Sequence, residues 1–196
     1  MDGPRMREGD QAVPHGLREP LRLLRGGALE GGVRTLLLWP DRACASEPRI
    51  SFGALWADVR GRRSQDSLEE SVLRLSEGLC AYRAGQSVDA RDAFRGALQA
   101  TTRVALEGAR WALNCSAHWS LALALRRSGD LDEAVKVARQ AAREAREREA
   151  FWLEGAARLA LGRVLRYVPG ERDRARANFD DAHRLLSAAH PPDPLG

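Results

Sequence analysis

The residues best suited to chemistry in this sequence are a cysteine and a histidine one helical turn apart. Cys115 and His118 lie in the segment CSAHWS, and such a pair could act as a nucleophile with its base or supply two metal ligands. Either role needs a third group, and none lies at a suitable spacing. The other three histidines also lack a cysteine or acidic partner: His15, His183 and His190. We therefore expect no catalytic residues and no enzymatic activity.

The remaining polar motifs do not predict a metal or cofactor site. Cys44, Cys80 and Cys115 are far apart and form no CxxC motif, which favours buried free thiols in a reducing compartment over a disulfide framework or a zinc site. The glycine-rich segment GGALEGG lacks the GxxxxGK[ST] pattern of a phosphate-binding loop. The expectation is a chain without a metal or a cofactor.

Arginine supplies almost all of the positive charge, because Lys136 is the only lysine among 31 basic residues. Arginine can bind phosphate or carboxylate through two parallel hydrogen bonds, but a GC-rich coding sequence would raise arginine, alanine and glycine together. The 27 acidic residues are interleaved with the basic ones, and the net charge is only +4. The arginine-rich run at residues 139–150 is interpreted as a solvated helix end, and we expect no nucleic-acid partner.

No segment of the sequence predicts contact with a membrane. The longest uncharged apolar run, TLLLWP, is far shorter than the roughly 20 residues that a membrane-spanning helix needs. The first residues lack the apolar core of a secretory signal. We therefore expect a cytoplasmic protein.

Residues 1–66 differ from the rest of the chain in their frequent glycine, proline and arginine, which predict turns and irregular chain. Two apolar stretches, residues 33–39 and 50–59, could each form a strand or a short helix. We expect residues 1–66 to be an N-terminal extension that is largely irregular or disordered. The leucines and tryptophan of VRTLLLW need burial, so this stretch is expected to cap one end of the domain that follows.

From residue 67 onward the sequence predicts six helices in three antiparallel pairs, over residues 67–190. The first helix has Asp66 or Ser67 as its N-cap, acidic residues in its first turn and Gly85 at its end. The segment PPDP ends the last helix and leaves residues 191–196 as a tail. Strand-like alternation is absent, so the fold class is all-α.

Small side chains recur at matched places in the three pairs. Gly85, Gly129 and Gly170 follow the first helices, and we expect the first two to adopt a left-handed conformation. The second helices then carry a repeated set on one face: Ala90, Phe94 and Ala97; Ala134, Ala138 and Ala141; Ala175, Phe179 and Ala182. The small residues let helices approach closely, and the phenylalanines fill the gap between pairs. The matching small contacts on the first helices are Gly78, Ala122 and Gly162.

This signature resembles the tetratricopeptide repeat family, in its long-repeat form of about 40–44 residues instead of the usual 34 or so. The resemblance covers about residues 67–190 and includes the Leu121-Ala122 and Leu161-Gly162 steps. It implies a right-handed α-α superhelix, a solenoid of about three helical hairpins. Generic alanine-rich hairpins are the alternative interpretation.

In tetratricopeptide proteins the first helix of each pair lines a concave groove that binds a peptide or a helix. By that resemblance the groove here would carry Leu75, Leu79, Tyr82, Trp119, Leu123, Arg126, Arg163 and Arg166. The candidate protein-binding residues are Tyr82, Trp119, Arg126, Arg163 and Arg166. An apolar floor with arginines at its rim would suit an amphipathic helix or an acidic peptide. The alternative is that Trp119 and Leu79 belong to the core between repeats.

The function that the resemblance implies is a non-catalytic scaffold or adaptor, with a partner peptide or helix bound in the concave groove. The alternative is a regulatory or sensor module of a larger signalling or transcription regulator. Because three repeats make a short stack, self-association would stabilise it, and a homo-oligomer is a further expectation.

Overall fold

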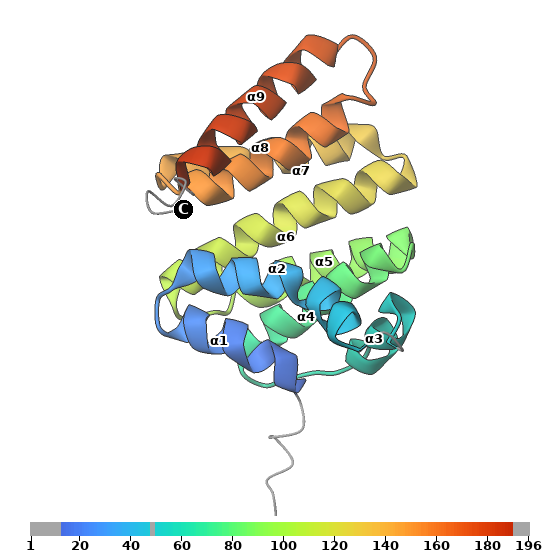
Figure 1. Ribbon diagram of the computed structural model, residues 1–196, viewed down its shortest axis with the longest axis vertical. Coiled ribbons are helices and arrows are strands. Elements are labelled where there is room, and N and C mark those ends of the chain that lie inside the picture. The colour runs from blue at the N-terminus through green and yellow to red at the C-terminus, as the bar shows by residue number, and fades with distance from the viewer. Residues whose placement is uncertain (1–12, 48–49, 190–196) are drawn as a thin grey trace, which may run out of the picture.

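The computed structural model describes residues 13–47 and 50–189, which form helices and connecting turns without a strand (Figure 1). The all-α fold class is therefore confirmed for this part of the chain. Its elements, in chain order, are the short 3-10 helix η2 (His15–Leu17), α1 (Arg18–Arg25), α2 (Leu29–Ser46), α3 (Phe52–Val59), α4 (Ser67–Arg83), α5 (Ser87–Thr101), α6 (Glu107–Ser128), α7 (Leu131–Glu147), α8 (Phe151–Leu165) and α9 (Arg172–Ala189).

The six helices predicted after residue 66 are present as α4 to α9, and local capping explains where two of them begin. The Asp66 side chain accepts hydrogen bonds from the backbone N–H groups of Leu68 and Glu69, at 2.9 and 3.0 Å, and so caps α4 as predicted. Asp130 caps α7 in the same way. The PPDP segment and the tail at residues 191–196 lie outside the described residues.

Two glycines end first helices in the left-handed conformation that the sequence predicts. Gly85 has a φ of +83° and Gly129 a φ of +89°. A side chain at such a φ is strained, whereas glycine adopts it without steric cost. Asp130, which directly follows Gly129, is the N-cap of α7. This Gly-Asp step therefore ends α6 and begins α7.

Helices α4 to α9 are arranged as a stack (Figure 1). Each helix contacts the next in sequence, and α6 also contacts α4 on one side and α8 on the other. The Arg95 guanidinium on α5 pairs with the Glu133 carboxylate on α7, at 3.0 Å. The first helices of successive pairs therefore lie side by side, and one ion pair links the second helices α5 and α7.

The recurring small residues lie where helices approach most closely, as predicted. A Cβ atom at Gly78 would collide with the ring of Phe94, and one at Gly162 would lie 2.8 Å from Cε1 of Phe179. The alanines of the repeated set are buried: Ala90, Ala97, Ala134, Ala138, Ala141, Ala175 and Ala182. Both rings pack against a glycine of their own pair. They therefore fill space within a pair, which corrects the prediction that they fill the gap between pairs.

The prediction that residues 1–66 are largely irregular is wrong for the described part, where α1, α2 and α3 are helical. Helix α2 continues through Pro40 because its apolar side chains are buried: Val33, Leu36 and Trp39. Gly32 allows α1 and α2 to approach, since a Cβ there would lie 2.7 Å from Cγ of Leu24. Burial of this face outweighs the poor helix propensity of glycine and proline. Residues 1–12 lie outside the described residues.

The VRTLLLW stretch, which was predicted to cap one end of the repeat domain, lies in α2 and occupies a different place. Helix α2 contacts both α4 and α6 and crosses in front of the stack (Figure 1). The guanidinium carbon of Arg34 lies 4.9 Å from the ring centroid of Trp152 on α8. VRTLLLW therefore does not cap one end only, because α2 runs along the first helices of successive pairs. The end of the stack at α4 is covered by α1 and α3.

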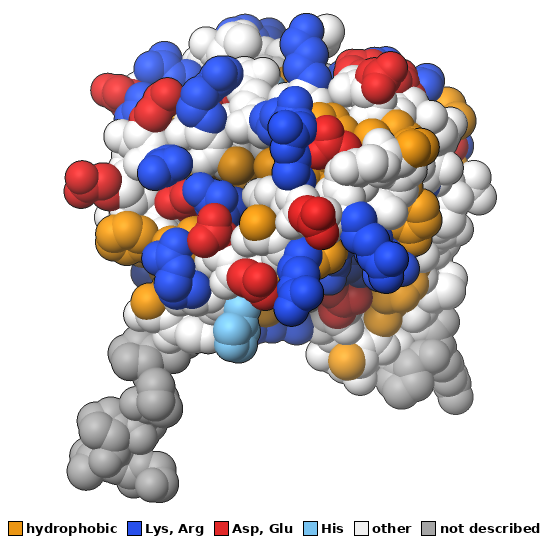
Figure 2. Space-filling view, turned by 90° about the horizontal axis from the view of Figure 1, so that it is seen from above, with side chains coloured by type: hydrophobic (Ala, Val, Ile, Leu, Met, Phe, Trp, Pro, Cys, Tyr) orange, Lys and Arg blue, Asp and Glu red, His pale blue; other side chains and the backbone are white. Residues whose placement is uncertain are grey.

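Acidic and basic side chains are interleaved on the face seen from the α9 end (Figure 2). This distribution agrees with the even mixture of charges along the sequence. Among the helices of residues 13–47 and 50–189, none combines the length and the apolar composition needed to cross a bilayer.

Candidate functional site

The five predicted protein-binding residues come from the first helices and their ends. Tyr82 lies on α4, Trp119 and Arg126 lie on α6, Arg163 lies on α8, and Arg166 follows its last residue. All but Trp119 line one hollow, and Trp119 lines an adjacent one together with Tyr82 and Arg163. The structure thus brings together residues that are up to 84 positions apart in the sequence.

The first hollow, which we call the arginine hollow, has a volume of about 440 Å³. It lies where α4, α6 and α8 end, and its lining residues are Tyr82, Arg83, Arg126, Arg127, Arg163, Arg166 and Tyr167. Five guanidinium groups therefore surround one space, and no acidic side chain belongs to the lining.

Two tyrosine rings organise the guanidinium groups of the arginine hollow. The guanidinium of Arg127 lies 3.7 Å from the ring centroid of Tyr82, and its Nη1 donates a hydrogen bond to the Tyr82 carbonyl at 2.6 Å. Arg126 and Arg166 lie 5.0 and 5.5 Å from the ring centroid of Tyr167. These cation-π contacts restrict the guanidinium groups without neutralising them.

One carboxylate reaches the edge of the arginine hollow, from α2. Asp41 accepts hydrogen bonds from Nε and Nη2 of Arg83 at 3.1 and 2.8 Å, and this pairing raises the pKa of Arg83. Within the described residues, no carboxylate lies within ion-pair distance of the other four arginines of the lining. The Nε atom of Arg126 is also buried without a hydrogen-bond partner. The hollow therefore carries unpaired positive charge.

The adjacent hollow, which we call the apolar hollow, has a volume of about 180 Å³. Leu37 of α2, Leu79 of α4 and Leu123 of α6 contribute to its lining. Trp119 is only 5% exposed, and its ring makes an edge contact with that of Trp152 at 6.2 Å between centroids. Leu79 is equally buried. Trp119 and Leu79 thus form part of the core, which was the alternative interpretation, and only their margins reach the hollow.

Several lining residues were not predicted from the sequence, and only some of them carried a detectable signal there. Arg83, Arg127 and Tyr167 each directly follow a residue that was predicted. Arginine also recurs shortly before the turn glycine, in YRAG, RRSG and RYVPG, and this recurrence could have identified the arginines. Leu37 and Asp41 carry no such signal, because they meet the first helices only through the position of α2.

The segment that contains Cys115 and His118 is buried and poorly suited to nucleophilic chemistry. Burial raises the pKa of the Cys115 thiol to about 12, and Sγ donates a weak hydrogen bond to the Ala141 carbonyl. Burial also lowers the pKa of His118, whose Nδ1 lies 3.8 Å from Glu144 Oε2. At neutral pH Cys115 is therefore a thiol and not a thiolate.

All three cysteines are free, as predicted; Cys80 and Cys115 are buried and Cys44 is partly exposed. Burial raises the pKa of Cys80, too, to about 12. In the part of the chain that the structure describes, no cluster of three or more histidine, cysteine or acidic side chains could hold a metal ion.

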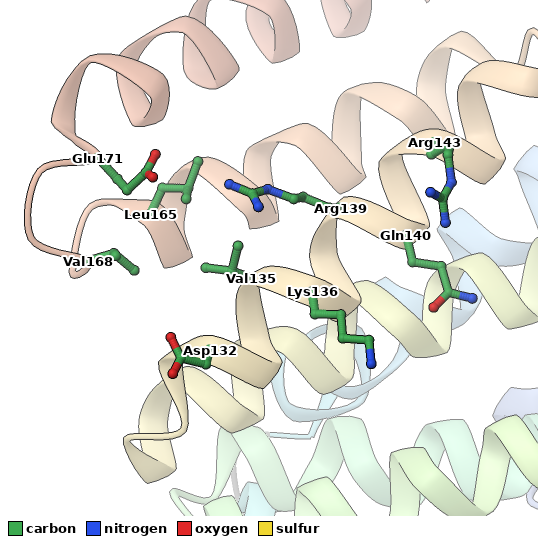
Figure 3. Close-up of a pocket in the computed structure, with 9 residues that line it drawn as sticks. All are labelled: Asp132, Val135, Lys136, Arg139, Gln140, Arg143, Leu165, Val168 and Glu171. Carbon is green, nitrogen blue, oxygen red and sulfur yellow. The ribbon is translucent and has the colours of Figure 1, made fainter.

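A wider hollow of about 530 Å³ lies between α7 and the turn from α8 to α9 (Figure 3). Arg139 extends from α7 toward Leu165 and Glu171, whereas Lys136 and Gln140 point away from them (Figure 3). Acidic and basic side chains both line this space, and these charged groups do not point toward a common centre. It is therefore a less defined binding site than the arginine hollow.

No protein-family model, curated protein or solved structure matches the chain. The fold and the site therefore define the class of protein: an all-helical stack whose first helices carry an arginine-lined hollow.

Proposed function

We propose that the protein is a non-catalytic protein–protein interaction scaffold that binds a peptide or a helix of a partner along α4, α6 and α8. In this proposal α4 to α9 form a right-handed solenoid of the tetratricopeptide type. The stacked order of the helices, the left-handed glycines and the small residues at close contacts support it.

The observation that carries the proposal is the convergence of polar side chains from three helix pairs on one open space. The arginine hollow takes residues from α4, α6 and α8, and Arg163, Arg166 and Tyr167 are exposed there. A site built from successive pairs suits an extended or helical ligand that crosses them.

Helix α2 provides an example of such binding within the chain itself. It packs Leu36 and other apolar side chains against the first helices and presents Asp41 to Arg83. A partner helix with apolar residues on one face and acids beside them would use the same kinds of contact.

A photo-crosslinking amino acid introduced in living cells tests this proposal. Tyr167 is 53% exposed at the hollow, and Val88 on α5 is 56% exposed and lines neither hollow, so they form a matched pair of positions. We expect covalent adducts with a discrete partner when the crosslinker replaces Tyr167 and none of these adducts when it replaces Val88.

The same crosslink should disappear when Arg163 and Arg166 are both changed to glutamate. Identical adducts at both positions, or none at position 167, would contradict the proposal.

A further inference from the structure

The positive charge of the arginine hollow exceeds what the fold can neutralise. The ends of α4, α6 and α8 each contribute about half a negative elementary charge, and Asp41 contributes one more. Five guanidinium groups line the space, so roughly half of their charge remains uncompensated. An anionic ligand would relieve this repulsion, which indicates the chemistry of whatever binds there.

We propose that the arginine hollow binds an acidic segment of a partner polypeptide, in competition with Asp41 for Arg83. Carboxylates of that segment accept hydrogen bonds from Arg126, Arg163 and Arg166. This inference rests on the proposed function and specifies the chemistry of the partner.

The geometry of the existing pair shows why a carboxylate suits the site. The guanidinium of Arg83 meets the two oxygens of Asp41 with two roughly parallel hydrogen bonds of 3.1 and 2.8 Å, which is the bidentate arrangement that guanidinium and carboxylate favour. The contacts with Tyr82 and Tyr167 hold Arg127, Arg126 and Arg166 near the space. Less side-chain entropy is then lost on binding.

The distribution of charge favours a polypeptide over a nucleic acid. A nucleic-acid backbone is followed by a continuous basic groove, whereas the 27 acidic residues of this chain are interleaved with its 31 basic ones. The excess positive charge is confined to a hollow of about 440 Å³, which has room for a few side chains.

Fluorescence anisotropy with the full-length protein tests the inference, with fluorescein-labelled hexaglutamate amide as the probe at low ionic strength. The double variant Arg163→Glu, Arg166→Glu should raise the Kd at least about tenfold, because it replaces two donors with two repelling acids. Both residues are exposed, so the fold should persist, and far-UV circular dichroism checks this.

The matched control is Arg139→Glu, Arg143→Glu on α7, which changes the net charge equally at two exposed arginines outside the arginine hollow. We expect a Kd close to that of the wild type. An equal loss of affinity in both double variants, or no loss in either, would overturn the inference. So would tighter binding of an oligothymidylate than of hexaglutamate.

The competition with α2 is tested by Asp41→Asn, which frees Arg83. The Kd for hexaglutamate should fall about two- to fivefold, the range expected for release of one exposed ion pair. Asp132→Asn on α7 makes the same charge change at an exposed residue away from the site and should leave the Kd unchanged. An unchanged Kd for Asp41→Asn would refute the competition.

These outcomes separate the inference from the proposed function. Suppose that crosslinks form at position 167 but the Kd for hexaglutamate is unchanged in the Arg163→Glu, Arg166→Glu variant. This result would support the proposed scaffold and contradict the inference that its partner segment is acidic. Specific binding of hexaglutamate without any partner crosslink at position 167 would count against the scaffold instead.

Discussion

At the residue scale, Gly78 sets the distance between the two helices of the first pair, and its replacement should destabilise the protein. A Cβ atom there would overlap the ring of Phe94, which is only 1% exposed. Gly78→Ala gains about 1 kcal/mol in helix propensity, but overpacking of a core costs about 1–3 kcal/mol. We expect a net loss of up to about 2 kcal/mol in the free energy of unfolding, measured by urea denaturation.

Gly96 on α5 is a matched control, because it also lies within a helix. A Cβ there would meet only the side chain of Arg74, at 3.5 Å or more. Gly96→Ala should therefore stabilise the protein by about 0.5–1 kcal/mol. If the two alanine variants were equally stable, the close approach at Gly78 would be disproved.

Burial of His118 should make stability depend on pH. Because burial lowers its pKa in the folded state, the unfolded chain binds the proton more readily, and stability falls as the pH drops below the ordinary histidine pKa of about 6.5. Glu144 opposes this effect but does not cancel it. His118→Gln should therefore lose less unfolding free energy than the wild type between about pH 7.5 and pH 5.

The comparison is made with His183→Gln, since His183 is exposed on α9. That variant should follow the wild-type dependence on pH. A steeper loss in His118→Gln than in the wild type would show that protonation of His118 stabilises the fold.

Individual residues of the site were predictable from the sequence only where a local pattern marked them. Tyr82, Arg126, Arg163 and Arg166 were predicted through the resemblance to tetratricopeptide repeats, which implies that the first helix of each pair lines the groove. The same resemblance could not show that Trp119 is buried, since that depends on Trp152 in the next pair.

At the scale of elements, burial along α2 differs sharply between two leucines that are two positions apart. Leu36 is fully buried, whereas Leu38 is 40% exposed. Leu36→Ala should cost about 2–5 kcal/mol in unfolding free energy, and Leu38→Ala less than about 1 kcal/mol. Thermal and urea denaturation of the two variants measure the difference. An equal loss of unfolding free energy in the two variants would contradict the packing of α2 against the first helices.

Helices α4 to α9 could be predicted because their signals are local: Asp66 or Ser67 as an N-cap, and glycine at the turns. The signals in α2 point the other way, since Gly31, Gly32 and Pro40 all disfavour a helix. This helix forms because its apolar face is covered by α4 and α6, and such coverage cannot be seen in a local window of sequence.

At the scale of the whole molecule, α6 is the centre of the contact network. It touches α5 and α7 beside it in sequence, α4 and α8 in the neighbouring pairs, and α2 across the front. Helix α9 instead has its main contacts with α8 alone. In an array of stacked units, stability is the sum of each unit and its nearest-neighbour contacts, so the ends open more easily than the middle.

Native-state hydrogen exchange should therefore show a gradient of protection along the stack. Backbone amides in the middle of α6 should have the highest free energies of opening, and those of α9 should have lower ones, because α9 can separate by breaking contacts mainly with α8. Mass spectrometry of peptides from α6 and α9 measures both in one sample. Equal protection in the two helices would mean that the chain unfolds as one cooperative unit, and the description of α4 to α9 as nested repeats would then fail.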